Sequence, residues 1–243
     1  VDAVGSVAAQ ALNFPHIVVA DTGLALGALA ANWRARFQLP IIAVTGSNGK
    51  TTSKEMIACI ARAALGDQAV LATQGNLNNE IGLPLTLLKL TAEHRFAVVE
   101  MGMSHPGEIA YLAQTARPNV ALITNAQRAH LAGMGQLADI AREKGTIFSG
   151  LTENGVAVFS ADAAAADAWR KQSQGHLLRT FSLGHAADVQ GCVKNNGLEN
   201  RLTIETGGEK IELPLALPGE HNARNALGAA TAAVLLVAGV PPA

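Results

Sequence analysis

Residues 41–65, "IIAVTGSNGKTTSKEMIACIARAAL", join an apolar run to a Gly-rich turn and then to a helix-forming segment. Strand, loop and helix in that order are the setting of a phosphate-binding loop. The usual pattern, G-x-x-x-x-G-K-[ST], requires a glycine where this chain has Val44. Gly46 and Gly49 still permit the close backbone approach that lets successive N–H groups point at phosphate oxygens. A plain turn does not need G-K-T-T at a helix start, so we predict a phosphate loop over residues 45–52.

The predicted loop places a cation and a hydroxyl at the start of the helix. Lys50 would reach the β- and γ-phosphates of a nucleotide, and the Thr51 hydroxyl would bind Mg²⁺. The residues that we expect to hold the nucleotide here are Thr45, Gly46, Ser47, Asn48, Gly49, Lys50, Thr51 and Thr52.

The composition favours a globular protein that acts on a small molecule. The chain has 243 residues, of which 49% are apolar, so it can bury a core. The net charge is −1, only 15% of the residues are charged and no basic block occurs. We therefore expect neither nucleic acid nor a membrane as a partner. We also expect a monomer. Cys59 and Cys192 lie far apart, which argues against a disulfide framework or a thiolate zinc site and fits a reducing cytoplasm.

The two ends of the chain carry no pattern typical of export or membrane insertion. Residues 1–16 lack the basic start and the long apolar run of a secretory signal. The apolar tail, residues 225–243, consists mostly of Ala and Gly and ends in Pro241-Pro242. We therefore predict a buried helix there rather than a membrane span.

From residue 40 onward, apolar runs alternate with helical stretches. The predicted strands are "IIAVT", "AVLAT", "FAVVEM", "NVALIT" and "GVAVFS", and the predicted helices cover 50–65, 79–90, 107–116 and 136–150. Unbroken apolar strands that alternate with helices predict an α/β fold, with a P-loop-type, mostly parallel sheet flanked by helices on both faces.

The flanking segments have a different texture. Before the alternation we predict a short strand over 16–21 and a helix over 22–37; after it, an Ala-rich helix over 161–169. "RLTIET" and "EKIELPL" flank Gly207-Gly208 and predict a small antiparallel hairpin, which the final helix follows.

Three ionisable residues follow or adjoin the predicted strands, where ligands of parallel sheets gather. Glu100 ends "FAVVE" and is either a solvated strand end or a metal ligand, because a buried carboxylate needs a cation or donors. His130, in a Gly-rich loop, is either an ordinary loop histidine or a ligand of metal or phosphate. Lys144, taken alone, is a solvated lysine paired with Glu143 or Asp139.

Two polar segments precede predicted helices, and each allows two interpretations. They contain Asn76, Asn78 and Asn79 in the first, and His221, Asn222 and Asn225 in the second. The first group either caps a helix or recognises a polar substrate. The second either caps the last helix or faces a base or ribose.

Six segments together resemble the Mur ligase family of ATP-dependent, amide-forming enzymes, and the resemblance extends from residue 39 to the end of the chain. In order they are "TGSNGKTT", "GNLNNEIGLP", "VVEMGMSHPGEI", "ITNAQRAHL", "KGTIFSGL" and "LPGEHNARNAL". The second and third segments resemble those of the family members that add D-alanyl-D-alanine to UDP-N-acetylmuramoyl-tripeptide in peptidoglycan precursor synthesis.

The resemblance implies roles for the residues that the patterns left open. The family's loop has the shorter form G-x-x-G-K-T, so Val44 is no defect. Lys144 matches a lysine that the family carbamylates, and a carbamate would attract Mg²⁺ where an ammonium repels it. The implied metal ligands are Thr51, Glu100, His130 and Lys144, and the implied catalytic residues are Lys50, Glu100, His130 and Lys144. The implied contacts to the adenosine end of ATP are His221, Asn222 and Asn225, and those to the muramoyl peptide are Asn76, Asn78 and Asn79.

The resemblance also implies a domain organisation. Residues 1–38 match the end of an N-terminal UDP-substrate domain, and residues 39–243 match the central ATP-binding domain. We expect the family's C-terminal Rossmann-like domain to be absent from this chain, which would then fold and bind ATP weakly without turnover. Two departures from the family pattern are Ala132, which removes a carboxylate near the metal region, and Thr146.

The implied reaction has two steps: a substrate carboxylate attacks the γ-phosphate of ATP to give an acyl phosphate, and an amine then displaces phosphate. Such chemistry asks chiefly for positioning and charge neutralisation. One alternative is another ligase of the superfamily, either one that adds a single amino acid or one of the folylpolyglutamate type. The other is a P-loop NTPase or nucleotide-binding module without ligase activity. The chain has no N-K-x-D guanine motif, which disfavours a GTPase switch.

Overall fold

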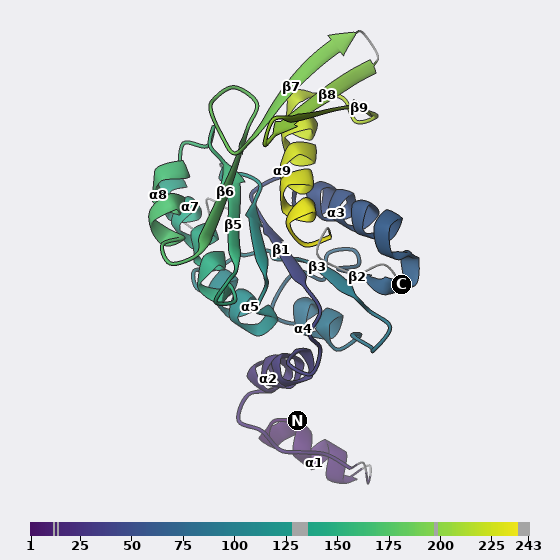
Figure 1. Ribbon diagram of the computed structural model, residues 1–243. Coiled ribbons are helices and arrows are strands. Elements are labelled where there is room, and N and C mark those ends of the chain that lie inside the picture. Colours follow the sequence, from purple (N-terminus) through teal and green to yellow (C-terminus); the bar gives the residue numbers. More distant parts are fainter. Residues whose placement is uncertain (12, 14, 128–135, 197–198, 238–243) are drawn as a thin grey trace.

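The protein is built on one large sheet, seen in the computed structural model of Figure 1. The structure describes residues 1–11, 13, 15–127, 136–196 and 199–237. Within them the strand order is β2-β3-β1-β4-β5-β6-β7-β8-β9. The strands are β1 (Ile41–Thr45), β2 (Val70–Ala72), β3 (Phe96–Glu100), β4 (Val120–Ile123), β5 (Val156–Ser160), β6 (Leu177–Ser182), β7 (Val189–Asn196), β8 (Glu199–Thr206) and β9 (Glu209–Leu215).

Strands β1 to β7 run parallel to one another. Strands β7, β8 and β9 form an antiparallel ribbon that projects from the sheet (Figure 1). The described helices are α1 (Ala3–Ala11), α2 (Thr22–Arg34), α3 (Lys50–Leu65), α4 (Gly82–Leu87), α5 (Glu108–Ala116), α7 (Leu137–Gly145), α8 (Ala166–Gln172) and α9 (Glu220–Val237), with short 3-10 turns η1 (Asp67–Ala69) and η2 (Thr146–Gly150). None of these helices is long and apolar enough to cross a membrane.

Both faces of the parallel sheet are covered, as its unbroken apolar strands require. Ile41 and Ala43 of β1 pack into the core beneath α2, α4, α5, α7 and α8. Ile42 and Val44 point the other way, into the core formed with α3 and α9. All four side chains are fully buried, because successive residues of a strand face opposite sides of the sheet.

The predicted α/β class, the five strands from residue 41 to residue 160 and the hairpin at Gly207-Gly208 are confirmed. The predicted strand over 16–21 is wrong: residues 15–21 form no regular element, and no strand in the described part of the chain pairs with them. Ile17 and Val18 are 80% and 55% exposed. An apolar run becomes a strand only when a partner edge is available.

Two further predictions need correction. The Ala-rich helix predicted over 161–169 begins only at Ala166, because the Asp162 carboxylate accepts hydrogen bonds from the Ser182 hydroxyl and from Leu183 N and holds the preceding residues in a turn. The strands β6 and β7 were not predicted, since Arg179 interrupts the apolar pattern of β6 and β7 carries few apolar residues.

Helix α2 is fixed to the sheet-bearing body by a buried arginine. Arg34 is 9% exposed, and its guanidinium donates to the carbonyl oxygens of Ala116 (3.1 Å), Phe37 (2.6 Å) and Leu39 (3.4 Å). Burial, with Arg117 nearby, lowers the pKa of Arg34 from its usual value. The guanidinium therefore satisfies three backbone acceptors between α2, the start of β1 and the end of α5.

We expect Arg34→Met to lower the free energy of unfolding by about 2–4 kcal/mol, because the three carbonyl groups lose their donor while the aliphatic volume is kept. The measurement is urea unfolding followed by circular dichroism. Arg36→Met is the matched control: Arg36 is exposed and lies 4.9 Å from the centroid of the Trp33 ring, so its loss should cost less than about 1 kcal/mol. Equal losses in the two variants would contradict the anchoring role of Arg34.

Candidate functional site

The turn between β1 and α3 has the backbone shape of an anion-binding loop. Gly49 lies directly before α3 with φ 77°, a conformation that favours glycine. A Cβ atom at Gly49 would overlap the Asn225 side chain, and one at Gly46 would overlap the Thr124 hydroxyl. Both glycines are therefore required by close approach, and the N–H groups of the first turn of α3 remain directed into the loop.

The loop is held from behind by the residues that follow β4. Ser47 N donates to Asn125 O (3.1 Å) and Asn48 N to Asn125 Oδ1 (3.1 Å), while Asn125 Nδ2 donates to Asn48 O (2.9 Å). The Ser47 hydroxyl and Gln127 exchange two further hydrogen bonds. Asn125 lies just after β4, at the carboxyl edge of the sheet where ligands were expected, but the sequence assigned it no role; Gln127 was not singled out.

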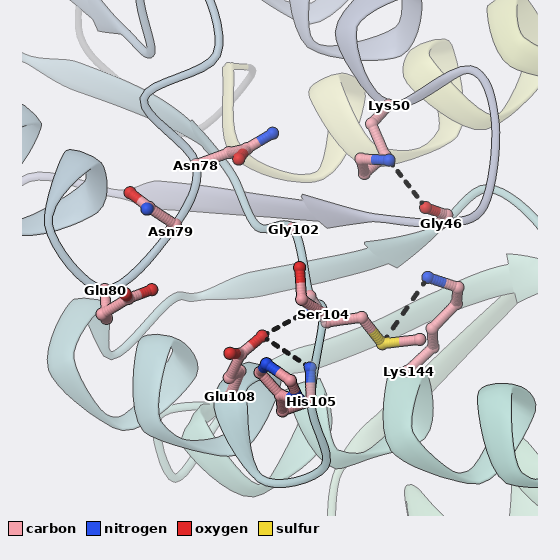
Figure 2. Close-up of a pocket in the computed structure, with 11 residues that line it drawn as sticks. Gly46, Lys50, Asn78, Asn79, Glu80, Gly102, Ser104, His105, Glu108 and Lys144 are labelled. Atoms are coloured by element: carbon pink, nitrogen blue, oxygen red, sulfur yellow. Dashed lines mark hydrogen bonds between the residues drawn. The ribbon is translucent and has the colours of Figure 1, made fainter. Parts of the chain in front are cut away.

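Lys50 turns back over the loop. Its ammonium donates to Gly46 O (2.9 Å) and, more weakly, to Ser47 O (3.4 Å), as Figure 2 shows for the first contact. Burial lowers the pKa of Lys50, and the Glu100 carboxylate opposes that shift. The ammonium thus lies against the backbone of the loop.

Glu100 is buried at the end of β3, with 2% of its surface exposed, so it is not a solvated strand end. Its Oε2 accepts a hydrogen bond from the Thr51 hydroxyl (2.8 Å) and its Oε1 one from Asn78 Nδ2 (2.8 Å). The backbone N–H of Glu100 donates to the Thr73 hydroxyl (2.9 Å). The carboxylate therefore joins the helix after the loop to the segment that carries Asn78.

Lys144 is also buried, with 2% exposed, and the expectation of a solvated lysine paired with Glu143 or Asp139 is wrong. Asp139 pairs with Arg142 instead, and the Glu143 carboxylate accepts from two backbone N–H groups at the start of α5. The Lys144 ammonium lies 3.9 Å from Met103 Sδ. Burial, reinforced by the charge of Lys50 and opposed by Glu143, lowers the pKa of Lys144 to about 7.

Lys50, Asn78 and Lys144 line one open cavity of about 350 Å³. Figure 2 shows Lys50 and Lys144 on one side of it and Asn79 and Glu80 across from them, with Glu108 at its base. The lining residues are Gly46, Lys50, Asn78, Asn79, Glu80, Gly102, Met103, Ser104, His105, Glu108 and Lys144. The cavity therefore has a cationic side next to the loop and an acidic and amide-bearing side away from it.

The asparagines and the histidine predicted as ligands differ in placement. Asn78 and Asn79 line the cavity, and Asn79 Oδ1 also accepts from Gly82 N (2.9 Å), so the capping interpretation holds for it as well. Asn76 is exposed and does not line the cavity. His130, like Ala132, lies outside the described residues.

The start of α9 reaches the loop through one residue. Asn225 is 8% exposed and lies against Gly49. Asn222 Nδ2 donates to Pro218 O (2.7 Å), which ties it to the preceding turn, and His221 is exposed. Arg224 lines a second cavity of about 220 Å³ at the carboxyl ends of β4 and β5, together with Thr124, Asn125, Ala126, Gln127, Ser160, Asp162, Ala163, Ala164, Ala165 and Trp169.

Comparison with protein families gives a match to the Mur ligase middle domain over residues 44–233. The chain is 43% identical over 226 residues to UDP-N-acetylmuramoyl-tripeptide--D-alanyl-D-alanine ligase of Haemophilus influenzae, covering 93% of this chain and 49% of the relative. The Escherichia coli protein of the same name is 44% identical over 223 residues, with 90% and 48% covered. The chain thus spans about half the length of the curated relatives it matches.

Solved structures show the same likeness. The crystal structure of MurF from Acinetobacter baumannii superposes with a TM-score of 0.84 at 37% identity, covering 91% of this chain and 48% of that one. MurF ligase from Thermotoga maritima in complex with ADP gives a TM-score of 0.78 at 26% identity, with 93% and 51% covered.

The depressed pKa of Lys144 predicts a pH-dependent cost in stability. Below pH about 7 the lysine is charged in the folded and unfolded states, and the cost of burying its ammonium is present in full. Between pH 7 and the unfolded value of 10.5 the unfolded state binds more protons, so this cost declines as the pH rises. We expect Lys144→Met to be more stable than the wild type by about 2–4 kcal/mol at pH 6, and the difference to shrink toward pH 10.

Urea unfolding in carbonate-free buffer across that pH range measures the difference. Lys89→Met, at an exposed lysine, is the control and should show no such trend. A pH-independent difference for Lys144→Met would contradict the burial of a titrating amine.

Proposed function

The chain belongs to the Mur ligase family, and we propose that it is the ATP-binding part of an enzyme that joins D-alanyl-D-alanine to UDP-N-acetylmuramoyl-tripeptide in peptidoglycan precursor synthesis. The observation that carries the proposal is the buried Glu100 carboxylate, hydrogen-bonded to Thr51 at the end of the phosphate loop. Lys50 and Lys144 line the cavity beside it. The names of the Haemophilus influenzae and Escherichia coli relatives support the choice of substrates.

The phosphates of ATP would lie on the loop and the nucleoside in the second cavity. Lys50 would move from the carbonyl of Gly46 to the β- and γ-phosphates, since an ammonium prefers an anion to a neutral acceptor. Asn125 and Gln127, which support the loop, also line the second cavity, together with Arg224 and Asp162. The Thermotoga maritima relative in complex with ADP supports a nucleotide in this fold. His221 and Asn222 are proposed at the outer edge of the nucleoside site.

The residues present fit Mg²⁺ bound together with nucleotide phosphates. Mg²⁺ takes oxygen ligands and is usually held by one or two carboxylates or hydroxyls plus phosphate and water. Thr51 and Glu100 provide a hydroxyl and a carboxylate 2.8 Å apart. We propose these two as ligands, with His130 as a third, and the ion would neutralise charge on the transferred phosphoryl group. Among the described residues no cluster of three His, Cys, Asp or Glu side chains forms a metal site without the nucleotide.

Lys144 is proposed to carry a carbamate. Its lowered pKa, about 7, leaves a large fraction of neutral amine at physiological pH, and only the neutral amine attacks CO₂. The nitrogen–carbon bond forms as the amine loses a proton, so a cation beside Lys50 becomes an anion. Lys144 would then attract Lys50 and Mg²⁺ instead of repelling them.

In the proposed reaction, the loop and Lys50 hold the γ-phosphate while the tripeptide carboxylate attacks it from the open cavity. Asn78 and Asn79 line the side of the cavity from which the peptide would enter, and we propose them, with Asn76, as peptide contacts. The amine of D-alanyl-D-alanine then displaces phosphate from the acyl phosphate. Residues 1–38 are proposed as the end of a UDP-substrate domain and 39–243 as the ATP-binding domain, acting as a monomer in the cytoplasm.

The ligase proposal is tested by phosphate release from the protein that contains this chain, with ATP, Mg²⁺, UDP-N-acetylmuramoyl-tripeptide and D-alanyl-D-alanine. We expect release to require all four. Lys50→Ala should lower the rate roughly 100- to 1,000-fold, because it removes a donor aimed at developing charge. Lys89→Ala, at an exposed lysine outside the cavity, is the control. Phosphate release that ignores the dipeptide would contradict the ligase and favour an NTPase.

The carbamate is tested by ¹³C NMR of the protein in ¹³C-bicarbonate. We expect one slowly exchanging carbamate resonance that disappears in Lys144→Gln and persists in Lys89→Gln. The signal should weaken as the pH falls below about 7, because protonation of Lys144 removes the nucleophile. A resonance that survives in Lys144→Gln would contradict the assignment.

A further inference from the structure

A second lysine of α3 is buried beneath the site and has no part in the proposed chemistry. Lys54 is 1% exposed and lies one turn after Lys50. Its ammonium donates to Thr73 O (2.9 Å) and pairs with Glu55, whose side chain is 57% exposed. Burying an ammonium is costly, so its retention at this place needs a compensating interaction.

Thr73 forms hydrogen bonds with both Lys54 and Glu100. Thr73 follows β2, is 1% exposed and donates its N–H to Val98 O (3.1 Å). Its carbonyl accepts from Lys54, and its hydroxyl accepts from the N–H of Glu100 (2.9 Å). Lys54 of α3 thus holds the carbonyl of Thr73, and the hydroxyl of Thr73 holds the backbone of Glu100 at the end of β3.

These contacts close a ring. Thr51 and Lys54 stand three residues apart on α3, a spacing that places both on one face of the helix. Thr51 bonds the Glu100 carboxylate directly, and Lys54 reaches the Glu100 backbone through Thr73. Thr73 also begins the segment that leads to Asn78, which bonds the other oxygen of Glu100. Helix α3 is therefore linked to Glu100 twice, directly from Thr51 to the side chain and through Thr73 from Lys54 to the main chain.

We propose that Lys54 is a positioning residue that fixes the Glu100 carboxylate relative to the Thr51 hydroxyl for Mg²⁺ binding, acting through Thr73; this rests on the proposed function. Mg²⁺ demands near-ideal octahedral geometry, so a ligand pair with a variable separation binds it poorly. Removal of a group that orients a metal ligand costs about 10- to 100-fold in metal affinity.

The first test needs no nucleotide. Lys54→Met removes the ammonium and keeps the aliphatic stem, and Thr73→Val removes the hydroxyl that accepts from Glu100 N–H. In both variants the exchange of the Glu100 amide hydrogen should accelerate by at least ~10-fold relative to that of the Ile42 amide. Thr115→Val is the control, because the Thr115 hydroxyl bonds Tyr111 O within its own helix. Unchanged protection of the Glu100 amide in both variants would overturn the proposal.

The second test separates metal from nucleotide. Calorimetric titration of the chain with ADP, first in EDTA and then with Mg²⁺, should show unchanged metal-free ADP affinity in Lys54→Met and a loss of about 10- to 100-fold in Mg²⁺ affinity. In a Glu100→Ala background the same substitution should cause no further loss, because it acts through that carboxylate. A lower melting temperature with unchanged Mg²⁺ affinity would assign Lys54 to stability alone and overturn the proposal.

If Lys54→Met does not fold, Thr73→Ser and Thr73→Val decide. Serine keeps the hydroxyl and should behave as the wild type, whereas valine should lose Mg²⁺ affinity and amide protection. Equal behaviour of the two variants would overturn the proposal. Absence of Mg²⁺-dependent ADP binding in the wild type would overturn the proposed function, while the amide-exchange measurement would still decide whether the ring positions Glu100.

Discussion

The burial of β1 on both faces is the constraint on which the site depends. With β3 on one side and β4 on the other, the four apolar side chains of β1 point into the two cores and Thr45 is buried as well, so the strand has no solvent-facing position. Polar chemistry is therefore possible only where β1 ends. The carboxyl ends of β3 and β4 meet it there, so Glu100 and Asn125 flank the loop from opposite neighbours. Ligands of open parallel sheets bind at such a place.

The sequence predicted what depends on local pattern and missed what depends on distant partners. Continuous apolar runs identified β1, β3, β4 and β5, and the Gly-rich turn identified the loop, because each signal lies within a few residues. The apolar run at 16–21 gave a false strand, since the pattern does not show whether a sheet edge is near. Lys144 was interpreted as solvated when taken alone, because the pattern around it does not show that Met103, distant in the sequence, lies against its buried ammonium.

The charged side chains of the site are each bonded to neutral groups, which a charged ligand can replace. Lys50 donates to backbone carbonyls, Glu100 accepts from a hydroxyl and an amide, and the Lys144 ammonium lies against the Met103 thioether. Each of these partners is neutral. A phosphate or a metal ion can replace a neutral partner at little cost, whereas a direct ion pair between Lys50 and Glu100 would have to be broken first. Lys50 and Glu100 therefore remain available to charged ligands, because they do not form an ion pair with each other.

The contact between Gly49 and Asn225 has a consequence for the order of events during synthesis. The phosphate loop lies near the start of the sheet-bearing body, but one wall of it comes from α9, almost at the end of the described chain. Helix α9 also completes the core above Ile42 and Val44. A nascent chain that has emerged only as far as β9 therefore lacks both that wall and that packing. The loop therefore lacks its Asn225 wall until α9 has left the ribosome, although the residues of the loop itself have emerged long before.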